Sequence, residues 1–239
     1  MNYTYYNKWI TPILSVRNEE HNTDLLVDEA NNWGGDSVLV NESFLSDRDQ
    51  SNQVGSLFKS GIYESSFDFF GEVERRGDCP ELAKLKTWME STFTTMFYSY
   101  FAEEDHYPDS VMSTFVDNNI EVEDIRVHLN ESWLHITRDG GYHGTHKHPN
   151  HSWALIYYID IGESSHSNGN NLFYADTSIL YTEFGNFWQR EDVWTLPPKN
   201  GVMIAFPASL SHSANVYRTE NDIGRYVVSG NVKVYCDKV

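Results

Sequence analysis

The chain has 239 residues, of which 40% are hydrophobic and 15% aromatic, so it is long enough to bury a sizeable core. Its formal net charge of −18 counts against nucleic acid as a partner, because that binding needs cationic side chains that release counterions from phosphates. The only two cysteines, Cys79 and Cys236, exclude a disulfide framework and a thiolate metal site, and they fit a reducing compartment.

The sequence shows no targeting or membrane-spanning segment. The N-terminus lacks both the basic start and the continuous apolar stretch of a signal peptide, and nowhere do eighteen apolar residues run together. These absences predict a cytoplasmic protein with no membrane partner, and they indicate nothing about its oligomeric state.

The first part of the chain mixes short elements with one long helix. Residues 8–16 have the pattern of a strand and residues 23–33 that of a short helix, whereas 36–66 are rich in turn residues. A helix is predicted to begin near Asp78, which forms a capping-box pattern with Glu81. Its apolar residues recur at helical spacing and predict a face packed on a sheet: Leu82, Leu85, Met89, Phe93, Met96, Phe97 and Phe101.

From Val122 onward the pattern changes to alternating and short apolar runs that are typical of strands. Turn residues separate the runs and no helical segments intervene, which favours an antiparallel sandwich or barrel over a parallel sheet. We therefore expect a mostly β fold with supporting helices in a single domain, 1–239. In it, residues 1–120 would form an N-terminal α+β supporting region and 121–239 the β core. The expected strands are 123–129, 132–138, 153–161, 171–175, 192–196, 201–207, 211–218 and 224–235.

Histidines suggest a metal site. His146 and His148 flank one residue, so on an extended segment both side chains point to the same face and can converge on one ion. The alternative is a pair of solvated loop histidines. His212 follows a strand that Pro207 interrupts, which suits a side chain aimed into the mouth of a barrel, although a single histidine can equally belong to the core.

The segment "RYVVSGNV" places Arg225 and Ser229 on one face of a strand. An arginine with a nearby hydroxyl can clamp a carboxylate, since the guanidinium offers a planar pair of donors. The alternative is a salt bridge with one of the 35 acidic residues of the chain.

Together, "HKHPNHSWALIYYI", "PKNGVMIAFPASLSHSANV" and "RYVVS" resemble the iron(II)- and 2-oxoglutarate-dependent oxygenases, and most of all their prolyl-hydroxylase-like branch with its bacterial and phage relatives. The resemblance is good over residues 128–235. It implies a double-stranded β-helix, the jelly-roll barrel also found in cupins. It also implies Fe(II), 2-oxoglutarate and dioxygen as cofactor and co-substrates, and hydroxylation of a small molecule, an amino acid or a peptidyl side chain.

Position by position, the resemblance makes His146 and His212 metal ligands. Arg225, assisted by Ser229 and Tyr158, would bind the distal carboxylate of 2-oxoglutarate. His148 stands where the family usually has Asp or Glu, so the metal site would consist of three neutral imidazoles, His146, His148 and His212. His143 and His151 are expected around the site rather than as ligands.

Two other functions fit the same residues. Cupins share the barrel and often bind metal through three histidines, but the glutamate that their motif places after His-x-His is missing here. A non-catalytic metal- or ligand-binding barrel would need no open coordination position. The approach to the metal is expected to be lined by aromatic-rich loops, 176–192 and 64–78.

Overall fold

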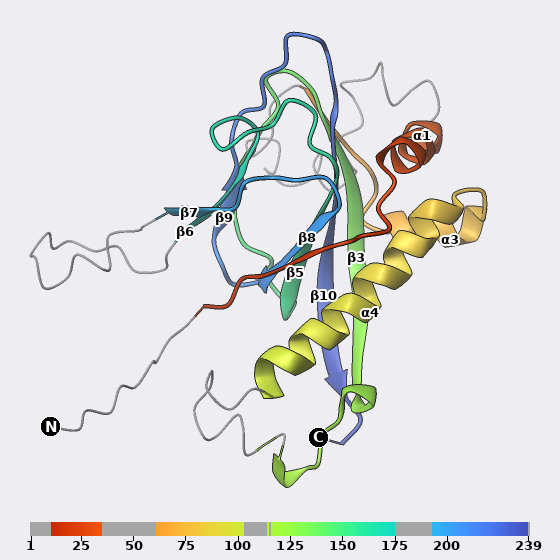
Figure 1. Cartoon of the computed structure of the whole chain (residues 1–239), viewed down its shortest axis with the longest axis vertical. Helices are drawn as coiled ribbons and strands as arrows, with labels where there is room; N and C mark the ends of the chain where they lie inside the picture. Colours follow the sequence, from red (N-terminus) through yellow and green to blue (C-terminus); the bar gives the residue numbers. More distant parts are fainter. Residues whose placement is uncertain (1–10, 35–60, 103–113, 115, 175–192, 239) are drawn as a thin grey trace, which may run out of the picture.

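Two antiparallel β-sheets form the core of the protein (Figure 1). The computed structural model describes residues 11–34, 61–102, 114, 116–174 and 193–238. One sheet has six strands in the order β1-β8-β5-β10-β3-β2, and the other has four in the order β4-β9-β6-β7. The strands are β1 (Leu14–Arg17), β2 (Ile62–Glu64), β3 (Ile125–Thr137), β4 (His143–His146), β5 (Trp153–Asp160), β6 (Asn171–Tyr174), β7 (Val193–Thr195), β8 (Val202–Pro207), β9 (His212–Ala214) and β10 (Arg225–Cys236).

The helices cover one face of the six-stranded sheet. They are α1 (Thr23–Gly34), α3 (Phe69–Arg76) and α4 (Pro80–Ala102), and a 3-10 turn, η3 (Val122–Asp124), leads into β3. Figure 1 shows all three helices on the same side of β3 and β10. None of the described helices combines the length and apolar character needed to cross a membrane.

Strand alternation divides the core into two layers. In β10, Tyr226 and Val228 pack with the helices, whereas Val227 packs with residues between the two sheets. Strand β5 is buried over its first seven residues because both of its faces are covered, which explains its unbroken apolar sequence. The opposite face of the six-stranded sheet is therefore free to line a site with the four-stranded sheet. This two-sheet antiparallel core is the predicted double-stranded β-helix.

The predicted long helix is confirmed as α4, but its N-terminus is capped differently from the prediction. In the described chain, the carboxylate of Asp78 accepts no hydrogen bond from the first amides of α4. It accepts hydrogen bonds from Arg76 instead, at 3.1 and 3.0 Å. The amides of Glu81 and Leu82 instead donate to the carboxylate of Glu29 in α1, at 3.0 and 2.8 Å. A tertiary contact between two helices thus replaces the local capping box.

Residues 64–78 line the cavity between the two sheets through Glu64 and Phe67, as predicted, but most of the segment is not a loop. They contain the end of β2 and helix α3, whose Phe69 and Phe70 are buried in the helix-side core. The second predicted loop, 176–192, lies outside the described residues. Strand β4 is a further element that the sequence pattern did not indicate.

The N-terminal region contributes strands to the same sheet as the β core. Strand β1 pairs with β8 at one edge, and β2 pairs with β3 at the other. The described part of residues 1–120 therefore shares a sheet and a core with the strands that follow. The single domain over 1–239 stays a prediction.

Candidate metal centre

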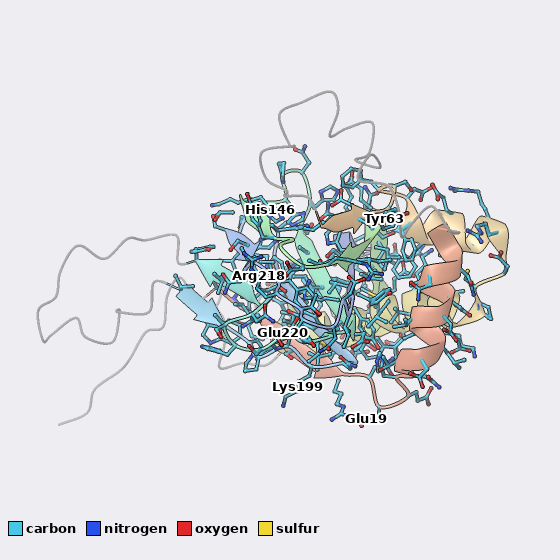
Figure 2. All side chains as sticks on the ribbon, turned by 90° about the horizontal axis from the view of Figure 1, so that it is seen from above. Glu19, Tyr63, His146, Lys199, Arg218 and Glu220 are labelled. Atoms are coloured by element: carbon cyan, nitrogen blue, oxygen red, sulfur yellow. The ribbon has the colours of Figure 1, made fainter. Side chains whose placement is uncertain are left out.

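A cavity of about 280 Å³ opens between the two sheets. Inward-facing side chains of β3, β5 and β10 form one wall, and residues from β4, β6 and β9 form the other. Figure 2 shows His146 on the strand side of the molecule and Tyr63 beside the helices. The cavity thus lies on the face of the six-stranded sheet that the helices leave open.

The three histidines predicted as ligands meet at this cavity. His146 ends β4 and lies opposite His212 of β9 in the strand register, and His148 follows two residues later. Their candidate ligand nitrogens all lie within 4.8 Å of one another, and the Nε2 atoms of His148 and His212 are 3.1 Å apart. Two nitrogens that each lie about 2.1 Å from one ion at a right angle are separated by about 3 Å.

Backbone carbonyls orient two of these rings. Nδ1 of His146 lies 2.8 Å from the carbonyl oxygen of Gly144, and Nδ1 of His212 lies 3.1 Å from that of Leu210. Because a carbonyl oxygen only accepts, each Nδ1 carries the proton and leaves the Nε2 lone pair available to a metal. The ring of His148 stacks on Trp133, with 5.7 Å between ring centroids.

Burial keeps the three imidazoles neutral. It lowers the pKa of His146, and together with the neighbouring histidines it lowers the pKa of His148 to about 3 and that of His212 to about 2. Neutral imidazole is the form that binds a metal, so the set is ready to act as a ligand at neutral pH.

Arg225 lies in the same cavity with only 4% of its surface exposed. Its Nη2 donates to Oδ1 of Asn171 at 3.0 Å, and its Nε has no hydrogen-bond partner in the described part of the chain. Burial lowers the pKa of Arg225, yet a guanidinium stays protonated in proteins. Among the described residues no carboxylate forms an ion pair with Arg225, so the predicted alternative of an internal salt bridge is not found there.

Of the two predicted partners of Arg225, Ser229 lines the cavity and Tyr158 lies behind its wall, next to the guanidinium. Tyr158 is fully buried, its ring centroid is 5.5 Å from the guanidinium carbon, and its hydroxyl donates to Asn171 at 2.8 Å. Burial raises the pKa of Tyr158 to about 12, so the phenol remains a donor. Ser229 lines the same cavity but makes no hydrogen bond to Arg225 in the described chain. Asn171, which joins Arg225 to Tyr158, was missed because nothing in its local sequence singles it out.

A second polar cluster lies beside the three histidines. His135 Nε2 and Glu64 Oε2 are 2.7 Å apart, and the ring of His143 is 4.4 Å from that of His135. His143 is also 6.0 Å from His146, ring to ring, as expected for a residue around the site. His151 lies at the cavity rim, where its Nδ1 is 3.0 Å from the carbonyl of Pro149. Sequence reasoning missed Glu64 and His135, which only the pairing of β2 with β3 brings together.

The fold and site define a class of protein, a double-stranded β-helix with clustered histidines and a buried arginine in one cavity. A family model described as "Putative 2OG-Fe(II) oxygenase" matches residues 131–231, which include all three histidines and Arg225. No curated protein matches the chain.

Several solved structures of low sequence identity overlap with part of the chain. A 2OG-Fe(II) oxygenase family oxidoreductase from Burkholderia pseudomallei is 10% identical, with 52% of each chain covered and a TM-score of 0.35. A Pseudomonas putida prolyl-4-hydroxylase is 11% identical over 52% of this chain and 58% of its own, with a TM-score of 0.34. AviO1 from Streptomyces viridochromogenes Tue57 is 14% identical over 56% and 64%, with a TM-score of 0.34. The chain thus spans between about half and just under two thirds of these proteins.

The family match covers most of the β core and agrees with the resemblance that the sequence motifs indicated. Enzymes of this family use Fe(II), 2-oxoglutarate and dioxygen. The described chain offers a group of histidines able to hold the metal.

Proposed function

We propose that the protein is a dioxygenase that uses Fe(II) and 2-oxoglutarate to hydroxylate an unactivated C–H bond of an amino acid, a peptide or another small molecule. One observation carries the proposal. A buried arginine that has no carboxylate partner among the described residues shares a cavity with three converging neutral imidazoles. An isolated buried cation is costly, so an anionic ligand is expected beside it.

His146, His148 and His212 would hold the iron. Three protein ligands leave the remaining positions of an octahedral ion open for a bidentate co-substrate and dioxygen. Since the ligands are neutral, the ion keeps its full charge of 2+, which favours a dianionic co-substrate such as 2-oxoglutarate.

Arg225 would bind the distal carboxylate of 2-oxoglutarate, with Tyr158 and Ser229 as neutral donors. Asn171 Oδ1 accepts hydrogen bonds from both Nη2 of Arg225 and the hydroxyl of Tyr158, and Nε of Arg225 has no partner among the described residues. A carboxylate beside Arg225 can replace part of this contact and gain a charge-assisted hydrogen bond.

When bound, iron, 2-oxoglutarate and dioxygen would supply the oxidising chemistry: one oxygen atom of O₂ enters succinate as 2-oxoglutarate loses CO₂, and the other enters the hydroxyl group of the product. The protein positions the reactants and excludes water. Trp133 stacks against His148, and Phe206 lies edge-on to His212 with 4.7 Å between ring centroids. These aromatic contacts fix the ligand rings and keep the surroundings of the metal apolar.

The cupin-type dioxygenase remains the second candidate because three histidines, and not two with a carboxylate, converge at the cavity. Such an enzyme does not require Arg225. A non-catalytic barrel would bind metal without consuming 2-oxoglutarate. Both alternatives therefore differ from the proposal in the role of Arg225.

The test compares Arg225→Ala with the wild-type protein in 2-oxoglutarate binding, by calorimetry with Mn(II) under nitrogen, and in succinate formation with Fe(II) and air. We expect at least a 100-fold weaker affinity for 2-oxoglutarate, because the variant loses the single buried cation of the described cavity wall. Arg75→Ala is the matched control, since Arg75 forms only an exposed ion pair with Asp68. Unchanged affinity in Arg225→Ala, or no succinate from the wild type, would refute the proposal.

A further inference from the structure

Glu64 is a carboxylate buried in the wall of the cavity, with only 7% of its surface exposed. It ends β2, and the strand register sets it directly opposite His135 of β3. Oε2 of Glu64 lies 2.7 Å from Nε2 of His135, while Oε1 is buried and has no hydrogen-bond partner among the residues that the structure describes. One oxygen of a desolvated anion is therefore left without a donor, which is costly unless a ligand provides one.

No cation of the described chain neutralises this carboxylate. Glu64 forms no ion pair with a lysine or arginine there, and the titratable side chains near its carboxylate are the histidines His135, His143 and His146. The other acidic residue that lines the cavity, Glu131, is engaged differently. Its Oε2 accepts a hydrogen bond from Asn231 at 2.8 Å and lies 3.8 Å from His151. On the described cavity wall, Glu64 is thus the carboxylate with an oxygen available to accept a hydrogen bond from a ligand.

The strand register places Glu64 beside the part of the cavity that lies between the three histidines and Arg225. His135 pairs with Val227, which lies two residues after Arg225 and two before Ser229 on the inner face of β10. The ring of His143 lies between the two clusters, 4.4 Å from His135 and 6.0 Å from His146. A ligand group held by Glu64 would accordingly sit next to the reacting centre.

We propose that Glu64, positioned by His135, binds a positively charged nitrogen of the substrate, an ammonium or guanidinium group. The inference rests on the proposed function and assigns its substrate class. A charged N–H donor satisfies Oε1 and compensates the buried anion, which a neutral hydroxyl does only in part. The net charge of −18 also favours the entry of cations over anions.

The charges in the loaded cavity agree with this assignment. Iron contributes 2+, Arg225 contributes 1+, 2-oxoglutarate contributes 2− and Glu64 contributes 1−, which add to zero. A substrate with a single positive charge then enters a neutral site and meets the carboxylate. The alternative occupant is a second divalent metal ion, because the ligand atoms of Glu64, His135 and His143 lie within 4.8 Å of one another. Such an ion would be repelled by both the iron and Arg225.

The experiment uses n-butylammonium as the probe and n-butanol as its neutral counterpart. The full-length protein is loaded with Mn(II) and 2-oxoglutarate, and the proton relaxation of each probe reports its approach to the paramagnetic ion. We expect n-butylammonium to be relaxed at least five-fold more than n-butanol, and Glu64→Gln to remove the difference. Glu131→Gln, the matched control on the same wall, should keep it.

Three results would overturn the inference: equal relaxation of both probes, an unchanged preference in Glu64→Gln, or binding of two metal ions per chain that falls to one in Glu64→Gln. Saturation transfer from the protein to each probe, measured without metal, detects binding of the probe at Glu64 even if the three histidines do not bind iron. Loss of 2-oxoglutarate binding in Arg225→Ala is measured separately, so the failure of the proposed function and the failure of this subsite are distinguishable.

Discussion

His148 is the residue whose chemistry departs most from the family pattern. Its Nε2 lies 3.1 Å from that of His212, and its ring stacks on Trp133, so the side chain is held ready to bind a metal. In the proposed site, a histidine in place of a carboxylate would make the ligand set neutral, and the negative charge would then come from the co-substrate. Retention of the metal should therefore depend on each imidazole.

His148→Ala should weaken Mn(II) or Fe(II) binding by about 100-fold, because losing a ligand costs at least as much as the 10- to 100-fold loss of a residue that only supports one. The measurement is metal affinity by calorimetry or by competition with a chelator. His151→Ala is the control: its ring lies near Pro149 and Glu131 at the rim, and its affinity should stay within two-fold of wild type. Equal affinities in both variants would contradict the ligand assignment.

Sequence spacing found the histidines that share one segment, but not the residues that depend on strand register. His146 and His148 are two positions apart, so local geometry alone predicts that they converge. Glu64 and His135 are 71 residues apart and meet only because β2 pairs with β3 at that position. Asn171 similarly comes from β6, and its contact with Arg225 follows from how the two sheets face each other.

At the scale of elements, strand and helix types were more predictable than their ends. The two expected strands at 123–129 and 132–138 form one strand, β3, because the polar residues between them make a bulge and not a turn. The register of β10 passes from Glu131 to Leu129 and skips Asn130. Sequence reasoning cannot distinguish these outcomes, since Asn and Glu are compatible with both.

The start of α4 yields a prediction that separates local from tertiary capping. Glu29→Ala should lower the free energy of unfolding by about 1–2 kcal/mol, since two helix amides lose a charged acceptor. Asp78→Ala should lower it much less, because the ion pair of Asp78 with Arg76 is largely exposed. Urea unfolding followed by circular dichroism measures both.

Asp28→Ala, at an exposed position of the same helix, controls for the change in charge and helix propensity. A larger loss of stability in Asp78→Ala than in Glu29→Ala would support capping of α4 by Asp78 and contradict capping by Glu29 of α1.

At the scale of the whole molecule, the two sheets enclose groups that are poorly satisfied without ligands. Within the described ranges, Arg225 Nε and Glu64 Oε1 are both buried without a hydrogen-bond partner, and three neutral imidazoles converge at the cavity. The helix-side core is independent of these groups, because the sheet separates it from the cavity. The folded protein should therefore be stable without ligands and gain stability stepwise as they bind.

Thermal unfolding tests this stepwise gain. A ligand that binds only the folded state at 100 times its Kd adds about 2.7 kcal/mol. For a chain of this size that raises Tm by about 5–10 °C, at about 2–4 °C per kcal/mol.

Mn(II) alone should raise Tm by about this amount, and 2-oxoglutarate added to the metal-bound protein should raise it again. Arg225→Ala should keep the first increase and lose most of the second. His212→Ala should lose both, because 2-oxoglutarate then has no metal to chelate. If 2-oxoglutarate raised the Tm of Arg225→Ala as much as that of the wild type, the arginine would not be its anchor, and the buried guanidinium would need another anionic partner.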